Sequence, residues 1–165
     1  MKNSVGKTSL FGLLFLLLSL ADLSAVPTFR PAAPSKYVTD YASVLKGNTA
    51  ERLSEQLADF DHRTLQELII VIYPSLPKPV SIQTYTQQLY DGWKIGVRGN
   101  QKGALLLIST QDRRGQIHVG RGLAPKLTEE VCRRIFLEKI APKLDAGDYD
   151  GACDAAVKAL IAAAS

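Results

Sequence analysis

Three acidic residues occupy positions that a β-sheet could bring to one of its ends. Asp40 closes a short segment that forms either an edge strand or a turn, Asp112 lies in a hairpin turn, and Glu129 stands in the first turn of a helix. Hard divalent cations prefer several oxygen ligands, so these carboxylates together with loop carbonyls predict a calcium or magnesium site. The alternative is structural, with the two aspartates in turns and Glu129 complementing a helix dipole.

An anion site is the second chemistry that the sequence allows, in the loop formed by Gly120, Arg121 and Gly122. The glycines would expose backbone amides, Arg121 offers a guanidinium fork for phosphate or carboxylate, and a helix N-terminus follows. Arg113 would join the site if its side chain reaches the same end of the sheet, and a solvated turn residue is the alternative.

No catalytic residue is assigned from the sequence. A phosphatase needs an attacking group, stabilisation of the phosphate charge and an acid or base, and no nucleophile stands out. His62 and His118 are both expected at the surface. No serine, histidine and aspartate set stands in a known hydrolase motif.

An alternation of strands and helices positions these residues. Continuous apolar runs at 68–73 and 104–109 predict strands that are covered on both faces. A helix capped by Ser81 joins them, which makes the two strands parallel neighbours. The turn at 110–115 is short, so the alternating segment 116–119 is expected to pair antiparallel with the strand before it.

Three further helices complete the predicted domain. The first begins near Asn48, where Glu51 is placed to close a cap, and the second follows Thr128 and is ended by Pro142. The third spans 149–163. This pattern predicts an α/β fold, a three-layer α/β/α sandwich with a mixed, mostly parallel sheet of about four strands and helices on both faces.

The N-terminal residues predict export. Two lysines precede an apolar block at 10–20 that is followed by small residues, as in a signal peptide, and a membrane-spanning helix would need about 20 apolar residues. We expect residues 1–25 to be a signal peptide, 26–36 a proline-containing linker and 37–165 the folded domain. The product would be periplasmic or extracellular after cleavage, or membrane-anchored if the signal stays uncleaved.

Charge and cysteine content exclude several classes of protein. The formal net charge is +4, and basic residues are spread along the chain without interleaved aromatics, so no nucleic-acid partner is expected. Cys132 and Cys153 are the two cysteines, and their spacing matches no zinc or redox motif. We expect two buried free thiols, no organic cofactor and a monomer.

Several motifs, in their order and spacing, resemble the TPM domain family over nearly the whole chain after the predicted signal. They are Val38-Thr39-Asp40-Tyr41-Ala42, Ser75-Leu76 after the first apolar run, Leu89-Tyr90-Asp91-Gly92-Trp93, Lys102-Gly103-Ala104, Asp112-Arg113, Gly120-Arg121-Gly122-Leu123 and Leu127-Thr128-Glu129.

The resemblance implies a family of mixed functions. Some members have been described as acid phosphatases, some bind calcium or similar ions, and others are accessory factors in assembling or repairing membrane complexes. The acidic cluster of the family maps onto Asp40, Asp112 and Glu129. Two departures from the family pattern matter. Arg121 stands where the family usually has an aromatic residue, and Ala124 stands where it has a glutamate, which the resemblance implies is a metal ligand.

We therefore expect an exported accessory binding or assembly module with protein partners at the cell envelope or membrane surface, and calcium or magnesium as its candidate cofactor. The lost carboxylate at Ala124, the proline-containing linker and the glycine-rich loop at 96–103 favour binding. The alternative is a metal-dependent acid phosphatase, whose hydrolysis of phosphomonoesters would depend on Asp112.

Overall fold

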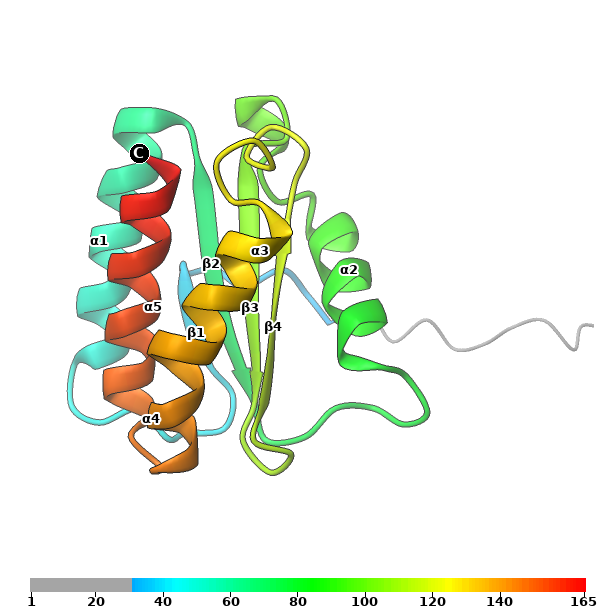
Figure 1. Cartoon of the computed structure of the whole chain (residues 1–165), viewed down its shortest axis with the longest axis vertical. Helices are drawn as coiled ribbons and strands as arrows, with labels where there is room; N and C mark the ends of the chain where they lie inside the picture. The colour runs from blue at the N-terminus through cyan, green and yellow to red at the C-terminus, as the bar shows by residue number, and fades with distance from the viewer. Residues whose placement is uncertain (1–30) are drawn as a thin grey trace, which may run out of the picture.

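A four-stranded sheet forms the middle layer of the protein, and helices cover both of its faces (Figure 1). The computed structural model describes residues 31–165, so the predicted signal peptide lies outside the described residues. The strands are β1 (Val38–Asp40), β2 (Glu67–Tyr73), β3 (Gly103–Ser109) and β4 (Arg114–Val119). The helices are α1 (Thr49–Thr64), α2 (Ile82–Trp93), α3 (Glu129–Ile135), α4 (Ala141–Asp145) and α5 (Tyr149–Ala164), with a 3-10 turn η1 (Val97–Gly99) and a π-helical turn η2 (Phe136–Ile140).

The strands are hydrogen-bonded in the order β1-β2-β3-β4. β1 pairs parallel with β2, β2 pairs parallel with β3, and β3 pairs antiparallel with β4. The predicted parallel pair and the predicted hairpin are both confirmed, and the segment ending at Asp40 is an edge strand. β4 begins at Arg114, two residues earlier than predicted, because Arg113 takes a left-handed backbone conformation with φ of 48° and closes the turn early.

Two separate cores explain the continuous apolar runs. Alternate residues of β2 and β3, such as Ile70 and Leu106, face the layer of α1, α3, α4 and α5. Their neighbours, such as Ile69 and Leu105, face α2 on the other side of the sheet. A strand that is covered on both faces needs apolar side chains at every position, which is what the sequence shows. The predicted three-layer architecture is confirmed.

The helix that follows Thr128 does not end at Pro142, as the sequence predicted. The chain continues from α3 through η2 into α4. Proline normally breaks a helix, because it lacks an N–H and its ring clashes with the carbonyl four residues earlier. In the π-helical turn just before it, the Ala141 N–H donates to the Phe136 carbonyl, five residues back. This wider turn accommodates the proline within a continuing helix.

The loop between α2 and β3 is tied to the rest of the fold at two points. The Gly96 N–H donates to Glu67 Oε2 at 2.6 Å, and Arg98 contacts Asp61 on α1 at 2.7 Å. Asp61 is buried and also accepts from the Tyr37 hydroxyl at 2.7 Å. Burial, with Asp61 alongside, raises the pKa of Tyr37 to about 12. These contacts fix the glycine-rich loop at the amino end of β3.

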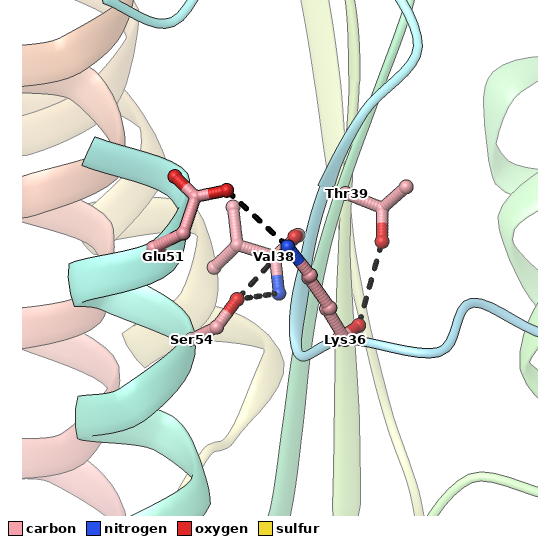
Figure 2. Close-up of polar contacts among 5 residues, drawn as sticks. All are labelled: Lys36, Val38, Thr39, Glu51 and Ser54. Atoms are coloured by element: carbon pink, nitrogen blue, oxygen red, sulfur yellow. Dashed lines mark hydrogen bonds and ion pairs between the residues drawn. The ribbon is translucent and has the colours of Figure 1, made fainter. Parts of the chain in front are cut away.

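The first turn of α1 departs from the predicted capping pattern. The Asn48 side chain makes no cap hydrogen bond, and Glu51 instead pairs with Lys36 at 3.2 Å (Figure 2). More than half of each of these two side chains is exposed, at 56% and 54%, so the pair contributes little stability. This ion pair lies beside the buried hydrogen bonds of Ser54, which contribute more to stability.

Ser54 on α1 closes the outer edge of β1. Its Oγ accepts from the Val38 N–H at 2.9 Å and lies 3.4 Å from the Val38 carbonyl oxygen, to which it can donate (Figure 2). Both residues are buried. β1 bonds β2 through Tyr37 and Tyr41 backbone groups, so the Val38 groups point away from the sheet. With those groups paired to a helix, this edge cannot accept another strand.

We predict that Ser54→Ala lowers the free energy of unfolding by about 1–2 kcal/mol, because it leaves the buried Val38 N–H without a partner. Denaturant titration should show a lower midpoint with an unchanged slope. Ser75→Ala is the matched control, since Ser75 is exposed, and should stay within about 0.5 kcal/mol of the parent. Equal stabilities of the two variants would contradict the role of Ser54.

Candidate functional site

The residues predicted to form sites lie at opposite ends of the sheet. Asp40 ends β1, and Asp112 follows β3, so both lie at the carboxyl end of the parallel strands. β4 runs back the other way, and the Gly120 N–H donates to the Gly103 carbonyl at the amino end of β3. Glu129 follows that loop. The structure therefore does not bring the three carboxylates together, which corrects the expectation of one acidic cluster.

Asp40 is used to hold the loop between β1 and α1. Its carboxylate accepts from the N–H groups of Ala42 at 3.0 Å, Val44 at 2.7 Å and Leu45 at 2.7 Å. Three backbone donors occupy most of its acceptor capacity, which leaves little for a cation. This is the structural role that the sequence left open for Asp40.

The donor set as a whole does not fit a calcium or magnesium ion. Within residues 31–165, no three histidine, cysteine or acidic side chains stand close enough to hold a metal together. Asp40 is engaged by amides, Glu129 lies toward the other end of the sheet, and the side chain of Ala124 carries no ligand atom. Hard cations need several oxygens in one place, and these residues do not supply them.

Asp112 and Arg113 border a cationic cavity at the carboxyl end of the sheet. The cavity has a volume of about 420 Å³, and its lining includes Lys78, Asp112, Arg113 and Arg114. Asp112 Oδ2 accepts from the Ser109 hydroxyl at 2.8 Å. Ligands of α/β proteins commonly bind at this end of the strands. Arg113 is thereby separated from Arg121, so the two do not form the single anion site that the sequence predicted.

The loop of Gly120, Arg121 and Gly122 does not present free amides. The Gly120 N–H is bonded to Gly103, the Gly122 N–H donates to the Gln101 carbonyl at 3.1 Å, and Arg121 Nε donates to Gln101 Oε1 at 2.8 Å. A side chain at Gly120 would collide with the Tyr90 hydroxyl. The glycines therefore allow close packing of the loop against the start of β3, and the arginine braces it.

His118 is partly buried, whereas the sequence predicted an exposed surface position. Its ring lies 4.7 Å from that of Tyr90 on α2, centroid to centroid, and it is half-buried beneath that helix. Burial lowers the pKa of His118, and the nearby Asp91 carboxylate offsets part of this effect. Burial also raises the pKa of Tyr90 to about 12. Sequence alternation showed that β4 has one covered face but could not show that α2 reaches its other face.

Both cysteines are buried and are not joined by a disulfide, as expected. Burial raises the pKa of Cys132 to about 11 and that of Cys153 to about 12. A thiol acts as a nucleophile through its thiolate, so neither side chain is activated at neutral pH.

The outer edge of β4 is the feature that the sequence analysis missed. Because the Gly120 N–H points to β3, the backbone groups of Gly115, Ile117 and Val119 point the other way in the antiparallel pattern. Within the described part of the chain, the one hydrogen bond to these groups is from Gln116 Nε2 to the Ile117 carbonyl, at 3.1 Å. The hairpin that ends in β4 was the available signal, since the last strand of a sheet has a free edge.

A groove of about 550 Å³ runs between this edge and the helix formed by α3 and η2. We call it the β4 groove. Its walls are β4 residues 115–119 on one side, and on the other Ala124, Leu127, Thr128, Glu129, Cys132, Arg133, Phe136 and Leu137. At one end Phe136 lies against Gly115, where a Cβ atom would approach within 2.5 Å of the ring. Leu137 is 54% exposed, which leaves apolar surface beside an unpaired strand.

Comparison with known proteins shows the family and the fold of this chain. The TPM domain family model matches residues 38–163, and the chain belongs to that family. A comparison with curated proteins finds no match. No helix within residues 31–165 is long and apolar enough to cross a membrane.

Three solved structures share the fold. The N-terminal domain of a protein from P. gingivalis is 25% identical with a TM-score of 0.71, and the match covers 78% of this chain and 81% of that one. The N-terminal domain of cg2496 from Corynebacterium glutamicum is 17% identical with a TM-score of 0.62, covering 82% and 84%. BA42 from Bizionia argentinensis is 13% identical with a TM-score of 0.61, covering 74% and 83%.

We predict that Asp40→Ala destabilises the protein by about 2 kcal/mol, because three backbone N–H groups lose a charged acceptor. Asp112→Ala is the matched control. It removes one part-buried hydrogen bond, from the Ser109 hydroxyl, and should cost about 1 kcal/mol. Denaturant titration of both variants measures the difference, and a larger loss from Asp112→Ala would contradict these assignments.

We predict that stability falls as the pH drops below about 6.5, the usual pKa of histidine. The folded-state pKa of His118 is depressed, so the unfolded chain binds a proton that the folded chain resists. His118→Gln should flatten this part of the profile, measured by denaturant titration from about pH 7.5 to 5.5. His62→Gln, at an exposed position, should leave the profile as in the parent. Identical profiles for parent and His118→Gln would refute the assignment.

Proposed function

We propose that this TPM-domain chain is an accessory binding module that docks onto other proteins at the cell envelope. The observation that carries the proposal is the β4 groove. It combines β4 backbone groups that no other strand within residues 31–165 pairs with, an apolar wall at Cys132 and Phe136, and the exposed side chain of Leu137. Apolar surface bordered by charged residues is typical of protein interaction sites.

The chemistry of the described residues supports binding over hydrolysis. Transfer of a phosphoryl group needs charge stabilisation together with an attacking group or an activated water. The cavity beside Asp112 offers cations, but His118 lies beneath α2 and the thiols carry raised pKa values. The proposal requires no metal ion, in keeping with the donor set around Asp40.

The envelope location in this proposal comes from the sequence. The signal peptide predicted for residues 1–25 lies outside the described residues, as does the start of the linker at 26–30. Within the described part of the linker, the Pro31 carbonyl accepts from Trp93 Nε1 at 2.8 Å. The chain thus enters the domain on the α2 side of the sheet, away from the core that α3 covers (Figure 1).

Site-specific crosslinking tests the proposal. We expect a photoreactive phenylalanine analogue in place of Leu137, in the full chain in its native host, to form discrete adducts with protein. The same analogue in place of Gln87, an exposed residue of α2, should not form those adducts. The same adducts from both positions would contradict docking at the β4 groove.

A hydrolysis assay separates this proposal from the alternative. We expect phosphomonoester cleavage by the purified protein to stay at background with or without added magnesium. Cleavage well above background that Asp112→Asn abolishes, with stability unchanged, would overturn the binding proposal in favour of a phosphatase.

A further inference from the structure

The outer edges of β1 and β4, the two end strands of the sheet, have different neighbours. At β1, a helix side chain pairs with the outward backbone groups, since Ser54 bonds both the N–H and the carbonyl of Val38. At β4, α3 stands away from the edge and leaves the β4 groove between them. Within β4 there is no proline, and its one charged residue is Arg114 at the first position, so the usual protections of an exposed edge are few.

The chain directions of β4 and of the helix fix the order of the side chains along the groove. β4 runs from Gly115, which packs on Phe136, towards Val119, which leads into the loop before Glu129. The helix therefore runs antiparallel to β4 along the groove. Glu129, Arg133 and Leu137 all line it, four residues apart on one side of the helix. From the Val119 end to the Gly115 end, the helix presents an acid, a base and an apolar side chain.

The spacing of these three side chains matches that of a strand. Four helical residues advance about 6 Å along the axis. Two residues of a β-strand advance about 6.7 Å, and alternate side chains of a strand face the same side. A strand lying in the groove would therefore place every second side chain opposite one of Glu129, Arg133 and Leu137.

We propose that the partner contributes an extended segment that adds to β4 as a fifth, antiparallel strand. From its N-terminus, the segment carries a basic, an acidic and an apolar side chain at alternate positions, facing Glu129, Arg133 and Leu137. These three residues lie opposite Val119, Ile117 and Gly115 and exchange backbone hydrogen bonds with them. Phe136 fills the space over Gly115, so its ring would lie beside the apolar residue of the segment. This inference rests on the proposed function and specifies the chemistry of the partner.

A capped heptapeptide of sequence TKTETLT is the probe, because it carries the three side chains in the required order. Added to the 15N-labelled protein, it should shift the amide signals of Gly115, Ile117 and Val119 and slow their hydrogen exchange. The peptide TETKTLT, with its charges exchanged, should bind about tenfold more weakly. A TKTETLT peptide N-methylated at its glutamate should lose binding, because that N–H would bond to β4.

A charge-reversed protein provides the matched control. The double variant Glu129→Lys, Arg133→Glu keeps the net charge and the strand edge but inverts the charge order, so it should prefer TETKTLT over TKTETLT. An unchanged preference, shifts that map away from β4, or no shifts at millimolar TKTETLT would overturn strand addition.

The outcomes separate this inference from the proposed function. If crosslinks at Leu137 persist while TKTETLT leaves β4 unshifted, docking at the groove stands and the strand-addition inference is wrong. Shifts at Gly115, Ile117 and Val119 that depend on protein concentration without peptide would point to pairing of β4 between two copies, which would also overturn it.

Discussion

Burial of β3 on both faces is the constraint on which the rest of the structure depends. Every residue from Gly103 to Ser109 is buried, so each side of the sheet needs its own helical layer. α2 supplies one layer, and α1 with the C-terminal helices supplies the other. β3 must also have a strand on each side, and the short turn after Ser109 makes the second neighbour antiparallel. The chain is thereby reversed, which carries the loop at Gly120 and the start of α3 to the opposite end of the sheet from Asp40 and Asp112.

That reversal leaves the two sheet edges in different surroundings. β1 lies against α1, whose Ser54 is near enough to pair with its outer backbone groups. After β4 the chain first turns through Gly120 and Gly122, which pack closely on Tyr90 and on the Asn100 carbonyl. This loop carries the chain past the end of β4 before α3 begins, so the helix crosses the face of the sheet without covering the strand edge. The β4 groove is the result of that route.

Local patterns predicted most of the fold, because strands, caps and the hairpin depend on nearby residues. Ser81 and Thr128 cap α2 and α3 through their side chains, as their positions indicated. The errors depend on contacts that are distant in sequence or on unusual backbone. Pro142 is accommodated by a π-helical turn that no simple periodicity signals. His118 is covered by Tyr90 of α2, a helix that lies well before β4 in the sequence. The acidic cluster does not form because the sheet topology carries Glu129 to the other end of the sheet.

The departure at Ala124 and the β4 groove belong to the same region of the molecule. Ala124 and Glu129 both line the groove, so the glutamate that family members usually carry at the first position would stand beside the second. Two carboxylates there would repel each other unless a cation or a base lay between them, and they would make the Val119 end strongly acidic. With alanine in place, Glu129 is the one acid in the groove lining among the described residues, and one complementary charge on a docked segment would balance it. A basic side chain on a docked strand supplies that charge, whereas a divalent ion would need more oxygen ligands than remain.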